Sequence, residues 1–288
     1  MSNTKEPRAV AVGILKGGFG KTTTAVNLAR ELAERNGRAL VVDLDDNGHL
    51  TLDLGHRNAF EADTNHAHAV LIDGDDPREH TVDVVDGLDL FPAHTELESV
   101  QNSLKEVQMG STRLKTHLVD ELLGDVYDYI VVDTPANRGK LADNAMYATN
   151  NIIIPLRPER GYESGLVNTV QRLVKQAQQY FELEILAVVP NNLGDRIDQQ
   201  TTDRQLLEEI NGREKIQPLV PNFAYFTEAD FQAIDAGTSD RQPGIRHRAA
   251  INDSLDERVP LRDYDPDCDQ LDHYDELAQI VENRGVIR

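Results

Sequence analysis

Glycines and lysines gathered in one short stretch are the strongest chemical signal in the chain. Residues 15–23 read LKGGFGKTT and lie between a short apolar run and an amphipathic one. Glycines let a loop fold tightly, so that successive backbone N–H groups point at phosphate oxygens, and a following helix adds its dipole. Lys21 then suits the β- and γ-phosphates of a nucleotide, and the Thr22 hydroxyl suits Mg²⁺. The candidate nucleotide-binding residues of this loop are Gly17, Gly18, Phe19, Gly20, Lys21, Thr22 and Thr23.

The elements that must position this loop alternate along the chain. Short apolar runs predict buried parallel strands, and apolar residues at i, i+3 and i+4 predict helices. Strands are expected at 9–15, 39–43, 87–91, 127–133, 152–156 and 184–190. Helices are expected at 22–35, 95–108, 112–123, 163–180, 201–210, 227–236 and 271–282. The alternation predicts an α/β fold: a doubly wound, mostly parallel sheet with helices on both faces, as in P-loop NTPases.

The segments between these elements are harder to assign. We expect loops with one short helix over 44–81, a mostly irregular stretch over 241–269, and a helix stop at Asn36-Gly37. The length fits one ATPase domain over 1–288, with an N-terminal tail at 1–8 and a C-terminal helix and tail at 271–288.

The phosphate loop resembles a known family. KGGFGKTT is similar to the deviant Walker A motif of the ParA/MinD family of P-loop ATPases. The stretch VVDLDDNGHLTLDLG resembles the family's second strand and its exit, and YDYIVVDTPANRG resembles its Walker B region. NAMYATNNIIIPLRPE resembles the helix end and strand that follow. The likeness is closest to ParA-type, Soj-like partition ATPases, and no helix-turn-helix domain fits before a loop that begins at residue 16.

Roles for individual side chains follow from the resemblance. Lys16 matches the signature lysine that reaches the partner's nucleotide in a dimer, and Lys21 matches the phosphate-binding lysine. Asp45 matches the carboxylate that positions the attacking water. The resemblance implies Mg²⁺ near Thr22, Asp43 and Asp133. An aspartate at a strand end is otherwise often a helix cap or a solvated edge, so the phosphate loop carries much of this assignment.

Two further stretches bear on the nucleotide. Asn191 matches a position that contacts adenine in related ATPases, and Asn192 is a neighbouring candidate; a turn within Pro-Asn-Asn is the alternative. The family's Pro-Gln after Asp45 is replaced by Asp46-Asn47, and an extra acid there can raise a neighbouring pKa. This departure bears on the rate of hydrolysis more than on binding.

The implied function is a ParA-type ATPase with ATP and Mg²⁺ as cofactors. It forms a homodimer with ATP, binds DNA without sequence specificity and hydrolyses ATP slowly. A ParB-like or cargo adaptor stimulates hydrolysis, and the cycle partitions or positions DNA or another cargo. The expected location is the cytoplasm, on the nucleoid, and no membrane contact is expected.

The charge of the chain complicates contact with DNA. Asp and Glu number 50 against 29 Lys and Arg, which gives a formal net charge of −21, so DNA binding needs a local basic face. The candidate DNA contacts are Arg241, Arg246 and Arg248. Nearby carboxylates are alternative partners for these arginines, Asp240, Asp253 and Asp256 among them. The 30 Asp, 8 Lys and absence of Trp also resemble proteins of salt-in halophiles.

Two alternative functions use the same loop. A MinD-like regulator of division or protein positioning at the membrane needs a basic amphipathic C-terminal helix, whereas Asp and Glu flank the stripe in 271–282; a helix docked on the core fits better. A reductase that bridges an iron–sulfur cluster needs paired cysteines, and the chain has only Cys268.

Overall fold

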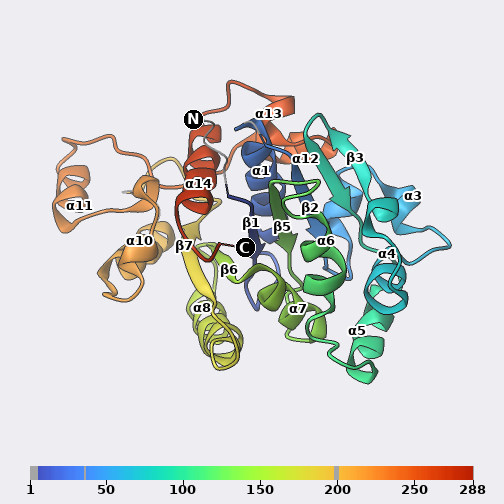
Figure 1. Ribbon diagram of the computed structural model, residues 1–288. Coiled ribbons are helices and arrows are strands. Elements are labelled where there is room, and N and C mark those ends of the chain that lie inside the picture. Colours follow the sequence, from blue (N-terminus) through green and yellow to red (C-terminus); the bar gives the residue numbers. More distant parts are fainter. Residues whose placement is uncertain (1–5, 36, 198–200, 288) are drawn as a thin grey trace, which may run out of the picture.

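A seven-stranded sheet runs through the middle of the protein (Figure 1). The structure is a computed structural model that describes residues 6–35, 37–197 and 201–287. The strand order is β3-β4-β2-β5-β1-β6-β7, and the paired neighbours are parallel except for β3 and β4. The strands are β1 (Arg8–Val12), β2 (Ala39–Asp43), β3 (Val82–Val85), β4 (Leu88–Phe91), β5 (Tyr129–Asp133), β6 (Asn151–Leu156) and β7 (Glu184–Pro190).

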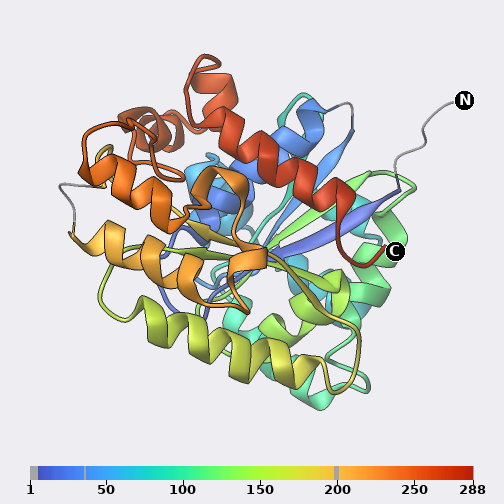
Figure 2. The same cartoon turned by 90° about the vertical axis from the view of Figure 1, so that its left-hand side faces the viewer.

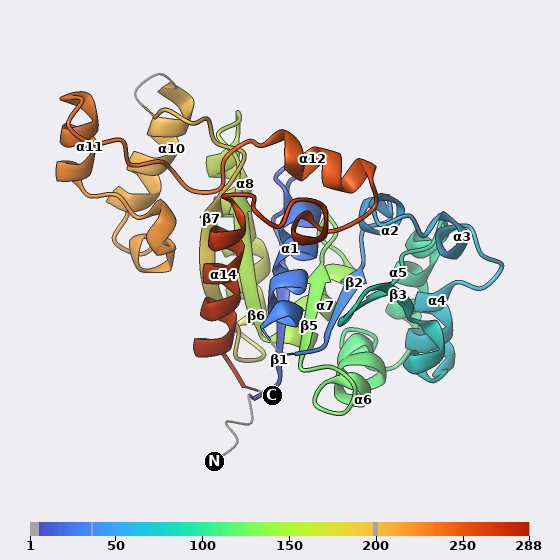
Figure 3. The ribbon, with the colours of Figure 1, turned by 90° about the horizontal axis from the view of Figure 1, so that it is seen from above.

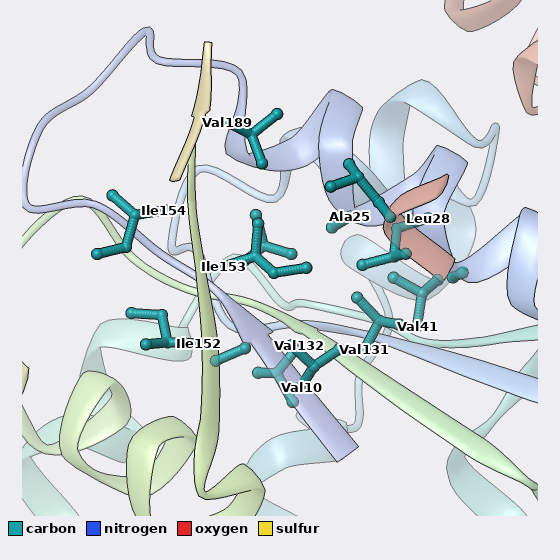
Figure 4. Packing of buried hydrophobic residues seen from close by; sticks show 14 of the residues in the cluster. Val10, Ala25, Leu28, Val41, Val131, Val132, Ile152, Ile153, Ile154 and Val189 are labelled. Atoms are coloured by element: carbon teal, nitrogen blue, oxygen red, sulfur yellow. The ribbon is translucent and has the colours of Figure 1, made fainter. Parts of the chain in front are cut away.

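The central strands are buried along their whole length because helices cover both faces of the sheet. Val131 of β5 pairs with Val10 of β1 on one side and with Val41 of β2 on the other. Side chains of the strands and of α1 interdigitate around them, Leu28 among them (Figure 4). This register aligns the carboxyl ends of β1, β2 and β5 at one edge of the sheet.

Helices lie on the two faces of this sheet. Helices α1 and α14 pack together on one face, and α7 and α8 pack against strands on the other; in Figure 2 the red α14 and the yellow-green α8 lie on opposite sides of the strands. The longer helices are α1 (Lys21–Glu34), α5 (Leu97–Glu106), α7 (Lys140–Thr149), α8 (Tyr162–Asn168), α10 (Thr201–Gly212), α11 (Glu228–Asp235), α12 (Ala249–Asp256) and α14 (Leu271–Asn283). The predicted doubly wound, mostly parallel sheet with helices on both faces is confirmed.

Short helical pieces join these elements. Those of α type are α2 (His49–Asp53), α3 (Arg57–Phe60), α4 (His66–His68), α6 (Asp120–Leu122), α9 (Lys175–Ala177) and α13 (Leu261–Tyr264). Stretches Ala69–Asp73, Lys115–Val119 and Thr169–Val174 are π-helical, and Pro77–His80, Gln217–Leu219 and Asn222–Ala224 are 3₁₀ turns. Helices α10 and α11 extend beyond the β7 edge, and α3 and α4 lie at the opposite edge (Figure 3).

Several boundaries differ from the sequence-based expectations. The first strand covers Arg8–Val12, so 13–15 belong to the loop, and β3 is an unexpected antiparallel edge strand whose half-exposed pattern hides it. Helix α7 is indicated only through the family resemblance. The stretch 241–269 is mostly irregular, as expected, but it also contains the two short helices α12 and α13, which the sequence pattern does not predict. Asn36 and the first five residues of the expected tail lie outside the described residues.

The C-terminal helix docks on the core, as its apolar stripe predicts. Leu271, Tyr274, Leu277, Ala278 and Val281 are buried in α14, which packs along α1. The expected core-docking helix is confirmed. Within the described ranges, every helix is too short or too polar to cross a bilayer.

Candidate nucleotide-binding site

The phosphate loop connects β1 to α1 at the carboxyl edge of the sheet. Gly18 and Gly20 both have a φ of +79°, a conformation that glycine adopts without a steric penalty. A Cβ at position 20 would lie 2.6 Å from Asn191 Oδ1, so a side chain there would also displace the Asn191 amide. Phe19 is buried and contributes packing through its ring. The turn therefore has the conformation that brings backbone amides into an anion-binding nest.

Lys21 and Asp45 lie together beside this loop. Both are buried, and Lys21 Nζ is 3.8 Å from Asp45 Oδ2. The other Asp45 oxygen accepts hydrogen bonds from the backbone N–H of Asn47, at 3.1 Å, and from its side-chain amide, at 2.8 Å. Burial and the neighbouring Asp45 carboxylate raise the pKa of Asp46, so the replacement of Pro-Gln places a second titratable carboxyl group next to Asp45.

Thr22 and Asp133 form the part of the site that suits Mg²⁺. The Thr22 hydroxyl donates to Asp133 Oδ2 at 2.7 Å. Asp133 Oδ1 is buried and has no hydrogen-bond partner among the described residues, so one carboxylate oxygen is left for a cation or its water. A hydroxyl and a carboxylate are the hard oxygen ligands that Mg²⁺ prefers, so the residues present fit this ion.

Asp43 supports the same region from β2. Its Oδ2 accepts hydrogen bonds from the Thr51 backbone N–H, at 2.9 Å, and hydroxyl, at 2.7 Å. Its Oδ1 accepts one from the Asp45 backbone N–H at 3.1 Å. Burial raises the pKa of Asp43 to about 6, and burial together with the charge of Asp43 raises the pKa of Asp133 to about 8. A divalent cation would favour the ionised form of both carboxyl groups.

Lys16 rests on its own chain. Its Nζ donates to the Arg160 carbonyl at 2.6 Å and lies 5.2 Å from the centre of the Phe19 ring. A lysine that acts across a dimer would have to leave this hydrogen bond. The amine is held by a neutral carbonyl and a ring face, and no carboxylate of the residues that the structure describes is paired with it.

The two asparagines that follow β7 lie beside the loop but differ in their contacts. Asn191 is buried, and its Nδ2 donates to the Phe19 and Leu156 carbonyls at 3.1 Å each. Asn192 Oδ1 lies 3.3 Å from His247 Nδ1. The Asn191 amide is thus used within the protein, while Asn192 lies on the more open side.

A pocket lies between the start of α1, these asparagines and the segment before α12. It is lined by Gly20, Thr23, Thr24, Arg157, Asn191, Asn192, Ile245, Arg246, His247, Arg248, Ile251, Asn252 and Tyr274. Its position next to Gly20 and Thr23 suits the remainder of a nucleotide bound by the loop. Arg157 and His247 are absent from the sequence prediction; the place of Arg157 directly after β6, at the same sheet edge, is the signal that could have found it.

The three arginines proposed for DNA contact are all paired. Arg246 and Arg248 both contact Asp195 and Asp269, and Arg241 lies 3.3 Å from Asp230. Arg246 has a side chain only 5 % exposed, so it is a structural residue in this conformation rather than a surface contact. Arg241 and Arg248 are 36 % and 25 % exposed.

Comparisons with known proteins agree with this geometry. The family model described as AAA domain matches residues 7–185. The chain is 30% identical to the sporulation initiation inhibitor protein Soj of Bacillus subtilis, over 96% of this chain and 99% of that protein. It is also 30% identical to the maintenance of carboxysome distribution protein A of Synechococcus elongatus, over 80% of this chain and 90% of that protein.

A solved structure extends the comparison. Cobyrinic acid a,c-diamide synthase from Mycobacterium smegmatis, with bound ADP and magnesium, superposes with a TM-score of 0.66 at 25% identity, over 84% of this chain and 100% of that one. The fold and the site together define a P-loop ATPase. The chain belongs to the ParA/MinD family of these ATPases, on its ParA-type, partition and positioning branch. The family and the residues present agree on ATP and Mg²⁺ as cofactors.

Proposed function

We propose that this chain is a ParA-type ATPase that dimerises on ATP, binds DNA non-specifically and hydrolyses ATP slowly. Its cycle partitions or positions DNA or another cargo in the cytoplasm, on the nucleoid. A ParB-like or cargo adaptor stimulates hydrolysis and release. The observation that carries the proposal is Lys16: its amine lies at the surface of the phosphate loop, and among the described residues its contacts are the Arg160 carbonyl and the Phe19 ring face.

The roles of the site residues follow from this proposal. When a second subunit binds, Lys16 leaves the Arg160 carbonyl. The Lys16 amine then neutralises the charge that develops on the phosphoryl group transferred in the partner's site. Lys21 holds the phosphates of its own subunit, and Asp45 orients the attacking water. Asn192 contacts the base from the open side of the pocket. Mg²⁺ is held by Thr22, with Asp43 and Asp133 acting through its water shell.

The surface that meets DNA must concentrate positive charge on an acidic protein. Arg241 and Arg248 have partly exposed side chains and are the arginines to test. DNA phosphates would have to compete with Asp230, Asp195 and Asp269 for them. Such a contact is weak in the monomer, so we propose that two subunits together supply enough charge to bind DNA.

Sedimentation with DNA tests the proposal. The protein is spun with long duplex DNA in ATP, ADP or no nucleotide, over a series of KCl concentrations. DNA binding is expected only with ATP. It should be lost above a moderate KCl concentration, because the release of counterions from DNA then contributes little to the free energy of binding. Lys16→Ala should lose DNA binding while it still binds ADP.

Lys105→Ala is the matched control, since it removes one exposed lysine from α5, far along the chain from the loop. Equal loss in both variants would show a general charge effect and would contradict the role of Lys16. If no nucleotide state binds DNA at any salt that keeps the protein folded, the DNA part of the proposal is wrong, and the ATPase assignment stands.

A further inference from the structure

Two side chains hold the phosphate loop from the ends of neighbouring strands. Arg157 directly follows β6, and its Nη1 donates to the Gly18 carbonyl at 2.8 Å. Asn191 directly follows β7, and its Nδ2 donates to the Phe19 carbonyl at 3.1 Å. Two successive carbonyls of the loop are therefore held by side chains more than 130 residues away in the sequence.

The two holding residues are themselves joined. Asn191 donates from both its backbone N–H, at 2.8 Å, and its Nδ2, at 3.1 Å, to the carbonyl of Leu156, the residue before Arg157. The pairing of β6 with β7 brings Leu156 opposite Pro190, the residue before Asn191. The sheet register thus fixes the spacing between the two points at which the loop is held.

The orientation of the carbonyls decides the orientation of the amides. Within one planar peptide, the C=O and the N–H point in opposite directions. A bond that holds the Gly18 carbonyl away from the loop turns the Phe19 N–H inward, and the bond to the Phe19 carbonyl does the same for the Gly20 N–H. Both amides belong to the loop that is expected to bind phosphate, so the two bonds would set the shape of the nest before a nucleotide arrives.

We propose that Arg157 and Asn191 are positioning residues that hold the phosphate loop in its anion-binding shape. Arg157 also brings a positive charge: its Nε is buried without a hydrogen-bond partner and lies 3.4 Å from a Glu159 oxygen. A guanidinium at this place favours an anion bound in the loop. Asn191 acts on the loop backbone instead of contacting the base, which is the role that the sequence alone suggests for it.

Hydrogen exchange of the protein with Mg-ADP bound, at concentrations that saturate each variant equally, tests the positioning role. Arg157→Ala and Asn191→Ala should speed exchange of the amides in residues 17–20, because the loop loses an anchor, while exchange in β1 and β5 stays unchanged. Arg157→Gln retains an amide donor for the Gly18 carbonyl and should exchange more slowly than Arg157→Ala. Arg160→Ala is the matched control, since Arg160 is exposed and contacts Lys16 through its backbone.

Affinity for Mg-ADP, measured with a fluorescent ADP analogue, is the second readout. Arg157→Ala should weaken binding about tenfold, the scale of one hydrogen bond from a charged group, and Asn191→Ala about fivefold, the scale of one neutral hydrogen bond. The double variant should lose less ADP affinity than the product of the two single fold-losses, because both residues hold the same loop. Mg-ADP binding needs neither DNA nor a second subunit, so these results are independent of the DNA proposal above.

Two results would overturn the inference. Unchanged loop exchange and unchanged ADP affinity in Arg157→Ala would show that the Gly18 contact is incidental. Weaker ADP binding with unchanged loop exchange would show that Arg157 touches the nucleotide directly and does not position the loop.

Discussion

At the scale of single residues, the site contains two kinds of side chain. Some are recognisable in the sequence by residue type and spacing, and the others come to the site only through the fold. The positions of Lys21, Thr22 and Asp133 at one edge of the sheet could be predicted, because the glycines, the strand ends and the family resemblance identify them in the sequence. The bonds from Arg157 and Asn191 to the loop could not, because they depend on how β6 and β7 align. The resemblance placed Asn191 at the site but not its use as a holder of the loop.

The buried carboxyl groups give a prediction on pH. The pKa of Asp133 rises to about 8 in the folded protein, so between its ordinary value and pH 8 the folded state binds more protons than the unfolded state. The free energy of unfolding of the protein without nucleotide or Mg²⁺ should therefore fall as the pH rises from 6 to 8. The slope for one group is at most about 1.4 kcal/mol per pH unit.

Asp133→Asn should flatten this profile, because the amide carries no charge and still offers an oxygen to the Thr22 hydroxyl. Urea denaturation at a series of pH values measures the free energy of unfolding of the wild type and of Asp133→Asn. The contributions of the histidines to the pH dependence cancel in the difference between the two proteins. Parallel profiles for wild type and variant would mean that Asp133 is already ionised in the folded protein at neutral pH. Saturating Mg-ADP should reduce the difference, since a cation favours the ionised carboxylate.

At the scale of elements, the strands and long helices follow from apolar pattern alone, because each buries a continuous face. Strand β3 cannot be predicted from such a pattern, because it lies at the sheet edge and is half exposed. Helix α12 cannot either, because only two of its residues are buried. In both cases the segment is held by its neighbours more than by its own pattern. The long helix that begins with α8 was predicted in extent, but not its π-helical turn at Thr169–Val174.

The C-terminal helix gives a prediction at this scale. Leu277 is fully buried in α14, so Leu277→Ala should lower the free energy of unfolding by about 2–5 kcal/mol. Gln279→Ala on the exposed side of the same helix should change it by less than about 0.5 kcal/mol. Thermal or urea denaturation measures both. An equally small effect for Leu277→Ala would mean that the helix leaves the core in solution, and would reopen the MinD-like alternative with a C-terminal helix free to meet a lipid surface.

At the scale of the whole molecule, charge is the dominant feature. A net charge of −21 repels anionic partners and also strains the compact state, because like charges lie close together on a folded surface. Salt bridges offset part of this locally, as at Arg248 with Asp195 and Asp269. The same carboxylates that neutralise the candidate DNA contacts therefore stabilise the segment before α12. Stability and DNA binding should respond to salt in opposite directions.

The free energy of unfolding should rise as KCl is raised from 0.1 to 1 M, because the screening length falls from about 10 to 3 Å. Asp253 and Asp256 give a local test, since both are exposed on α12 and Asp256 lies at its C-terminal end, where an acid opposes the helix dipole. Asp253→Asn with Asp256→Asn should add about 0.5–1 kcal/mol at 0.1 M KCl and less at 1 M, by urea denaturation. An equal gain at both salt concentrations would assign the effect to helix propensity. A free energy of unfolding that keeps rising above 1 M KCl, where screening is nearly complete, would support the halophilic interpretation of the composition. A plateau near 1 M KCl would contradict that interpretation and indicate an ordinary acidic protein.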